Sequence, residues 1–176
     1  MNAPPVLVRW LGVGGVVAAV AFTTMYEGTR YTTYRDSGGV LTACVGETAY
    51  IATPGDIKPG AKFTKAQCDA ALIRSFGAHA DGLLKCAGDA AYDWSPGQRV
   101  AILDFTFNVG VAAACNSTLI RLAKAGDMNG ACQEFSRWYR VGQMDCRKPA
   151  NANKCGGIPK RRVAEYQLCL ESENAG

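Results

Sequence analysis

The chain begins with a long apolar run and continues with a body in which polar and apolar positions alternate over short distances. Residues 10–26 contain no charged side chain, and Arg9 is the one charged side chain before them. This run is near the short limit for a helix that crosses a bilayer, which needs about 20 residues. It is also weakly hydrophobic, because glycine, alanine and threonine make up much of it. The pattern therefore predicts an N-terminal helix with a marginal preference for lipid.

Three interpretations of residues 1–26 fit this composition. The segment is a permanent anchor, a cleaved signal peptide, or an uncleaved export signal that inserts weakly and later leaves the bilayer. The stretch from Ala19 to Ala21 fits the small-residue pattern of a cleavage site after Ala21. We favour the uncleaved signal, because a permanent anchor is normally richer in leucine and isoleucine. In addition, the first residue after the run is the carboxylate Glu27.

The body, residues 27–176, has the pattern of one small hairpin followed by helices. β-branched and aromatic residues flank the turn signal Asp36-Ser37-Gly38-Gly39, which predicts a β-hairpin. No repeat or linker interrupts the body, so we expect one α+β domain in which a hairpin lobe precedes a helical lobe. After a loop at 54–59, apolar periodicity and capping residues predict helices over 64–83, 95–107, 117–125, 129–140 and 159–171. Thr64 with Gln67 and Ser95 with Gln98 form capping boxes at the starts of the first two helices. One face of the first helix holds Cys68, Leu72, Phe76, His79 and Leu83.

Composition limits the class of partner. The 176 residues are 48% hydrophobic and 19% charged, which is typical of a globular chain. The net charge of +4 favours an anionic partner such as a cell wall. The positive charges are too few and too scattered to indicate nucleic-acid binding.

The cysteines indicate the compartment. There are eight of them, an even number, none within the apolar run and none in C-x-x-C spacing. With a single histidine, His79, a zinc site is not expected, and we expect no metal. A disulfide framework in an oxidising compartment is the better interpretation. The pairing stays open except for Cys146 with Cys155, which would close a short loop.

Two carboxylates and a threonine lie at the start of the body. One protonated and one ionised carboxylate on either side of a glycosidic bond are the usual equipment for its hydrolysis. Glu27, beside the apolar run, suits the acid, and Asp36, in a polar turn, suits the ionised partner. Thr42 on the returning strand could hold a water molecule. Spacing alone is weak support, because a Glu and an Asp this close occur in many proteins.

The stretch "EGTRYTTYRDSGGVLTACVGET" resembles the catalytic signature of the phage-type lysozymes, glycoside hydrolase family 24. Four later blocks resemble the family in the same order: "FNVG", "STLIRLAKAGD", "EFSRW" and "GIPKRRVAEYQLC". The resemblance covers nearly the whole chain after Tyr26. It implies a lysozyme-like fold and an inverting hydrolysis of the β-1,4 bond between N-acetylmuramic acid and N-acetylglucosamine of peptidoglycan, without a cofactor.

The resemblance also implies residue roles. Glu27 would be the general acid, Asp36 the base that activates water, and Thr42 the residue that seats this water. Arg161 matches a position whose guanidinium contacts the catalytic Glu, the alternative being a surface charge on the last helix. Glu47 stands where the family commonly has a histidine, usually a structural one, and is a weak alternative acid.

The apolar run joined to this signature resembles a narrower class, the endolysins with a signal-anchor-release segment. This implies export by the host Sec machinery and an inactive form tethered to the inner membrane through residues 10–26. The tethered form would face the periplasm, and a monomer would enter the periplasm on release and lyse the host cell. Residues 10–26 contain no cysteine, so we expect activation by a conformational change. Two alternatives stay open: a secreted lysozyme with a cleaved signal peptide, and a catalytically silent, membrane-tethered wall-binding protein.

Overall fold

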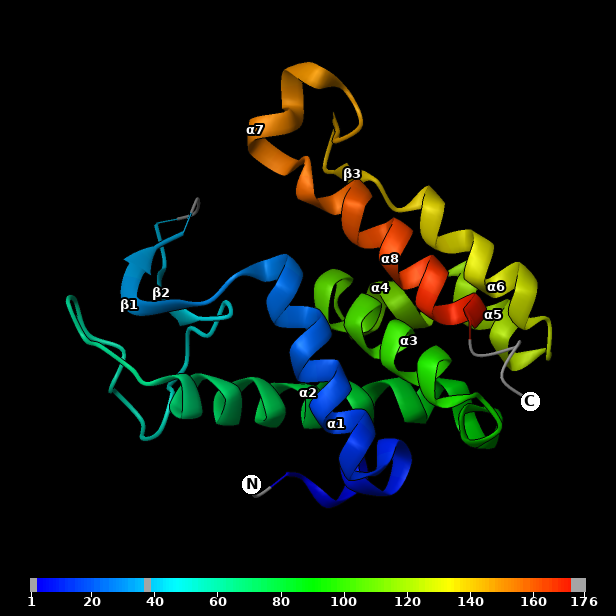
Figure 1. The fold of residues 1–176 in the computed structure, drawn as a ribbon, viewed down its shortest axis with the longest axis horizontal. Coiled ribbons are helices and arrows are strands. Elements are labelled where there is room, and N and C mark those ends of the chain that lie inside the picture. The colour runs from blue at the N-terminus through cyan, green and yellow to red at the C-terminus, as the bar shows by residue number, and fades with distance from the viewer. Residues whose placement is uncertain (1–2, 37–38, 172–176) are drawn as a thin grey trace. The chain divides into compact units, whose positions relative to one another are not determined.

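A computed structural model describes residues 3–36 and 39–171 (Figure 1). The chain forms two compact units, Met1–Ala78 and His79–Gly176, and the boundary between them falls within one long helix, α2. The first unit contains α1 (Pro5–Glu27), β1 (Arg30–Arg35), β2 (Leu41–Cys44) and most of α2 (Lys65–Ala87). The second contains η1 (Gly88–Tyr92), α3 (Pro96–Val109), α4 (Val111–Cys115), α5 (Thr118–Lys124), α6 (Met128–Glu134), η2 (Phe135–Arg137), β3 (Arg140–Val141), β4 (Met144–Asp145), η3 (Pro149–Asn151), α7 (Ala152–Cys155) and α8 (Gly157–Glu171), where η denotes a 3-10 helix.

The apolar N-terminal run is helical, and α1 reaches beyond it at both ends. The helix has 23 residues and is long and apolar enough, by length and composition, to cross a membrane. Gly12 breaks it with φ 70° and ψ 167°, a conformation that essentially only glycine adopts. Before the helix, Pro4 lies against Gly77 of α2, where an added Cβ atom would come within 2.4 Å of the Pro4 ring. The absence of a side chain at Gly77 therefore makes room for the N-terminal segment.

The predicted hairpin is present, as β1 pairs antiparallel with β2. The register places Tyr34 opposite Thr42 and Arg35 opposite Leu41. Of the predicted turn, Ser37 and Gly38 lie outside the described residues. On its other side β1 receives the segment before α2, with the Phe63 N–H donating to the Tyr31 carbonyl at 2.7 Å. β1 therefore has a hydrogen-bonded neighbour along each edge, β2 on one side and the segment before α2 on the other.

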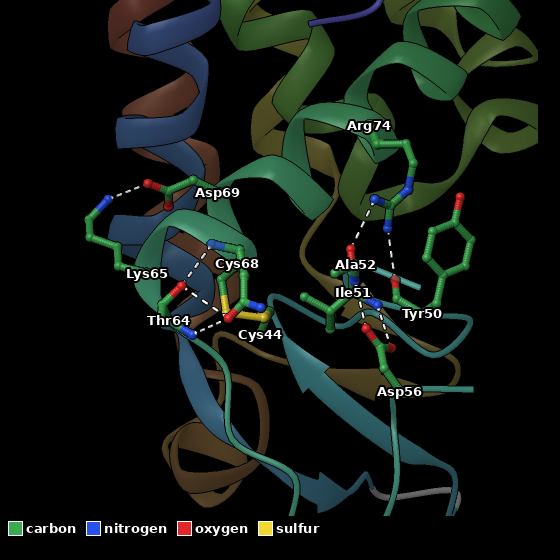
Figure 2. Close-up of a disulfide and its surroundings, with 11 residues drawn as sticks. Cys44, Tyr50, Ile51, Ala52, Asp56, Thr64, Lys65, Cys68, Asp69 and Arg74 are labelled. Atoms are coloured by element: carbon green, nitrogen blue, oxygen red, sulfur yellow. Dashed lines mark hydrogen bonds and ion pairs between the residues drawn. A yellow bond between two sulfur atoms is a disulfide. The ribbon is translucent and has the colours of Figure 1, made fainter. Parts of the chain in front are cut away.

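A small core holds the hairpin, the loop and α2 together in the first unit (Figure 2). The disulfide between Cys44 and Cys68 joins the end of β2 to the first turns of α2. The loop between them folds around Asp56, whose carboxylate accepts N–H bonds from Ile51, Ala52 and Thr53 at 2.7–3.0 Å. Desolvation raises the pKa of Asp56, but these backbone bonds outweigh it and leave that pKa below its usual value.

The helix α2 confirms the prediction for residues 64–83. Thr64 and Gln67 form the predicted reciprocal cap, with the Thr64 N–H donating to Gln67 Oε1 at 2.8 Å and the Gln67 N–H to Thr64 Oγ1 at 3.2 Å. The residues predicted to share its inner face are buried, except His79, which is partly buried against the ring of Phe107 at 5.3 Å.

In the second unit, α3 is the central helix and packs against α8 (Figure 1). The predicted capping box at Ser95 and Gln98 begins α3, and Pro96 occupies its first turn. The ring of Phe105, in the middle of α3, packs edge-on against Phe135 at 5.5 Å. Burial of eight of the 14 residues of α3 makes it the core helix of this unit.

Two predicted helix boundaries are wrong. The helix expected over 129–140 ends at Glu134, passes through the 3-10 turn η2, and is followed by the short hairpin of β3 and β4. Gly142, with φ 55°, provides the turn of that hairpin, which local helical periodicity does not reveal. The last helix begins at Gly157, before the expected Pro159. The helix expected over 117–125 is present as α5, with Ser117 as its N-cap.

The disulfide framework is confirmed. Cys146 and Cys155 are bonded as predicted and close the loop that carries η3 and most of α7. Each of the four bridges joins cysteines of the same unit, and the pairs beyond this one are Cys44–Cys68, Cys86–Cys115 and Cys132–Cys169. Because bridges of this kind restrict the unfolded chain, they are expected to stabilise both units.

Candidate active site

Glu27 is the last residue of α1, and its side chain is exposed. The helix ends there because Gly28 adopts φ 68° and ψ 166°, while its N–H still donates to the Thr24 carbonyl at 3.2 Å. The Thr24 hydroxyl in turn donates to the Val20 carbonyl at 2.8 Å. The Glu-Gly pair in the sequence therefore has a structural reason: the glycine ends the helix and fixes the backbone that carries the carboxylate.

Asp36 lies at the end of β1, where the hairpin turns. Its Oδ1 accepts the Val40 N–H at 2.9 Å, and its own N–H donates to the Val40 carbonyl at 3.0 Å. These two bonds fix both the backbone and the carboxylate of Asp36, although the residue is exposed.

Thr42 lies on β2, and only 2% of it is exposed. Its hydroxyl donates to the Val40 carbonyl at 2.9 Å. Because its only proton is used in this bond, the Thr42 hydroxyl can only accept a hydrogen bond from any further partner. Val40 thus connects the two candidate residues through one peptide backbone. Sequence reasoning missed this link, since it depends on the register of the hairpin.

Glu47 is held beside the hairpin by α2. Its backbone exchanges two 2.9 Å hydrogen bonds with Ala43, the residue after Thr42. Burial raises the pKa of its carboxyl group, while the positive charge of Arg74 and a hydrogen bond with Ser75 oppose that shift. Arg74 also donates to the Tyr50 carbonyl at 2.8 Å (Figure 2). These contacts favour a structural role for Glu47, which links the hairpin to α2.

Arg161 lies in the second unit, on α8, and only 3% of it is exposed. The alternative of a surface charge is therefore wrong. Its guanidinium makes a bidentate pair with Asp104 of α3, with both N···O distances at 2.7 Å, and lies 3.5 Å from Glu165. Arg162 is buried as well. It forms an ion pair with Glu165 at 3.0 Å and donates a hydrogen bond to Asn108 at 2.7 Å.

This buried charge cluster, Asp104, Arg161, Arg162 and Glu165, was largely missed by sequence reasoning. Burial raises the pKa of Glu165 well above 4.5, and the charge of Arg162 only partly opposes this. One signal was available, since Asp104 interrupts the apolar stretch "AILDFTF" at an inward position of α3. A buried carboxylate there needs a cationic partner.

Glu27, Asp36 and Thr42 belong to the first unit, and Arg161 belongs to the second. Within the residues that the structure describes, no three His, Cys, Asp or Glu side chains gather as a metal-binding cluster. The chemistry that this set of residues can offer is proton transfer by two carboxylates and the orientation of water by a hydroxyl group.

Comparison with known proteins identifies the class. The model of the phage lysozyme family matches residues 24–165. The chain is 33% identical over 148 residues to the SAR-endolysin of bacteriophage PS119, covering 82% of this chain and 76% of that protein. It is 34% identical over 161 residues to the SAR-endolysin of Escherichia phage Mu, covering 89% and 82%. The solved endolysin from Escherichia coli O157:H7 phage FAHEc1 has the same fold, with a TM-score of 0.72 at 23% identity over 92% of this chain and 94% of that one.

A small hairpin followed by a helical bundle with these matches defines a lysozyme-like glycosidase. The chain belongs to the phage lysozyme family. It is a phage endolysin, and lysozymes of this family act on peptidoglycan. Its N-terminal apolar helix is consistent with anchoring to a membrane.

Proposed function

We propose that this endolysin cleaves the β-1,4 bond between N-acetylmuramic acid and N-acetylglucosamine with inversion at the anomeric carbon. Glu27 donates a proton to the leaving oxygen, and Asp36 takes a proton from a water molecule that attacks the opposite face of the sugar. Thr42 holds this water. Every proton that moves in the reaction is accounted for by these two carboxylates, so the proposed mechanism uses no cofactor.

The observation that carries this proposal is the shared hydrogen bonding of Asp36 and Thr42 to Val40. The Thr42 hydroxyl donates its proton to the Val40 carbonyl, so it acts as an acceptor toward a water molecule. A water that donates one hydrogen to Thr42 and the other to Asp36 has its lone pair directed away from both residues, as an attacking nucleophile needs.

Arg161 supports Glu27 in this proposal, as the family resemblance implies. The fixed position of the guanidinium favours this supporting role, because its Nε and Nη2 atoms are both bonded to Asp104. A guanidinium fixed in this way has little freedom to turn, so it is suited to orienting a second partner.

The second part of the proposal concerns α1. The host Sec machinery exports the chain, and α1 holds it in the inner membrane with the body in the periplasm, inactive, until membrane depolarisation releases it. Glu27 ends α1, so it lies at the membrane surface while α1 is in the bilayer. After release, α1 packs into the protein, with Leu7, Trp10 and Ala19 buried without residual exposure.

These buried positions argue against cleavage after Ala21. Removing residues 1–21 would take away Leu7, Trp10 and Ala19, as well as Pro4, which lies against Gly77. The folded enzyme would lose most of the helix that leads into Glu27. We therefore retain the uncleaved segment as part of the active enzyme.

The test of the chemistry is hydrolysis of purified peptidoglycan by the full chain and by Glu27→Gln. The variant should lose activity, while Glu171→Gln should keep it, because Glu171 is also the last residue of an α-helix and also exposed. Proton NMR of the first products should show the anomer opposite to that of the substrate. Equal activity of Glu27→Gln and the parent, or a product of retained configuration, would refute the assignment.

A further inference from the structure

The helix α1 carries an apolar stripe on its outer side in the folded protein. Val13, Val17 and Met25 are 70%, 51% and 74% exposed, and Ala21 between them is exposed too. These four residues, the α1 stripe, recur every four positions beyond the kink at Gly12, so they lie along one side of the helix. The stripe therefore presents a continuous apolar surface to solvent.

The opposite side of α1 is the one that the fold buries. Val16, Ala19 and Thr23 are 2%, 0% and 0% exposed, at spacings of three and four residues. Of the eight large hydrophobic residues that are exposed in the described parts of the chain, three belong to the α1 stripe. Single exposed apolar residues are ordinary, but a gathered set on one helix face is typical of a binding surface.

The charges around the stripe suit a lipid surface. Between Arg9 and Glu27 the helix has no charged side chain, so contact with lipid would not remove water from a charged group in this stretch. Arg9, on the short turn of helix before the break at Gly12, is exposed, and a cation there is attracted to anionic headgroups, while the exposed Glu27 lies at the far end of α1. A helix with an apolar side and a cationic end is suited to lie in the plane of the membrane interface.

We propose that the folded, released enzyme binds the surface of an anionic bilayer through the α1 stripe, without spanning it. The inference rests on the proposed function, in which the same helix first crosses this membrane. One side of α1 then packs into the protein, and the other side stays on the lipid. Release thus moves the enzyme from across the membrane to its surface and keeps it beside the wall that it degrades.

The test uses the purified, folded full chain and vesicles of phosphatidylethanolamine with phosphatidylglycerol. The parent should sediment with these vesicles and be extracted from them by alkaline carbonate, as expected of a surface-bound protein. The triple variant Val13→Ser, Val17→Ser, Met25→Ser should bind at least about tenfold more weakly, because three apolar side chains no longer enter the interface.

The matched control replaces exposed valines elsewhere. Val141 and Val163 are 49% and 55% exposed in the second unit, about as exposed as Val17, so the double variant Val141→Ser, Val163→Ser removes two comparable apolar side chains away from α1. It should bind vesicles like the parent. Hydrolysis of purified peptidoglycan without lipid should be equal in the parent, the triple variant and the control, which shows that all three are folded.

Three results would overturn the proposal: equal vesicle binding by the parent and the triple variant, no binding by the parent, or parent protein that resists carbonate extraction. A dimer of the parent that the triple variant abolishes would assign the stripe to self-association instead. Failure of the proposed chemistry is a separate result, because it appears as absent hydrolysis of lipid-free peptidoglycan whatever the vesicles bind.

Discussion

The helices α1 and α3 are both rich in apolar residues, yet the fold uses them differently. α3 buries eight of its 14 residues, begins with a side-chain capping box and runs without a break. α1 buries six of its 23 residues, has no side-chain cap and is broken at Gly12. The sequence of α3 thus suits a single environment. That of α1 suits two environments, lipid and the folded enzyme, and is optimal for neither.

The polar residues of the two helices sharpen this contrast. α3 carries Asp104 fully buried, which the fold tolerates because Arg161 neutralises it. α1 carries no acid before its last residue, Glu27, so nothing in its middle resists transfer into a bilayer. A helix that must leave the membrane again is instead weakened by small residues.

The largest expected effect is on catalysis at the end of α1. Glu27→Gln should lower the rate of peptidoglycan hydrolysis by about 10³-fold, the usual scale for removing a general acid. The free energy of unfolding should change by less than about 0.5 kcal/mol, because the side chain is exposed. Turbidity loss of purified wall and denaturant unfolding measure the two quantities, with Glu171→Gln as the control.

In α3, replacing an acid by its amide should mainly lower the stability of the fold. Asp104→Asn leaves the buried guanidinium of Arg161 without its bidentate partner, so the free energy of unfolding should fall by about 3–5 kcal/mol. The control is Asp81→Asn, because Asp81 is half exposed in its pair with Lys85 and should contribute less than about 1 kcal/mol. Equal stability of the two variants would contradict the role assigned to the buried charge cluster.

A third prediction concerns the break in α1. Gly12→Ala forces an alanine into φ 70° and ψ 167°, which should destabilise the folded enzyme by about 1–3 kcal/mol while favouring a straight helix in lipid. After depolarisation with an uncoupler, more of this variant should stay in the membrane fraction in a form that resists extraction by alkaline carbonate. Gly14→Ala is the matched control, since its backbone is helical and an added Cβ atom meets nothing within 4 Å. Equal release of both variants would show that the break does not matter.

The smallest effect is a pH dependence of stability that comes from the buried charge cluster around α3. Burial raises the pKa of Glu165 well above the value of 4.5 expected in the unfolded chain. Its contribution to stability is therefore complete below pH 4.5 and is lost as the pH rises toward the folded pKa. Glu165→Gln does not titrate, so the free energy of unfolding of the parent should fall relative to that of the variant over this range. Parallel curves for the two proteins would contradict the assignment.

Local signals predicted much of this fold. The caps at Thr64 and Ser95, the hairpin around Asp36, and the Cys146–Cys155 bridge each depend on residues close together in the chain. The break at Gly12 was not predictable, because glycine fits a straight helix and a broken one almost equally well. The boundary after residue 26 stays a prediction.

The site was predictable only in part. The catalytic roles of Glu27, Asp36 and Thr42 came from the family resemblance and stay predictions, since their spacing alone is unspecific. The link through Val40 required the register of the hairpin. The pairing of Arg161 with Asp104 joins positions 57 residues apart, and no local pattern determines which buried charges meet.

The central claim is that α1 is both the anchor and the first helix of the active enzyme. Its most direct test is the intact mass and N-terminal sequence of the protein from the membrane and periplasmic fractions of expressing cells, each assayed for lytic activity. The account predicts a chain that begins at Met1 in both fractions. It should be lytic where α1 has left the bilayer, that is, in the periplasm or in protein that alkaline carbonate extracts from the membrane, and inactive where it resists extraction. A lytic chain that begins at Phe22 and occurs only in the periplasm would contradict it.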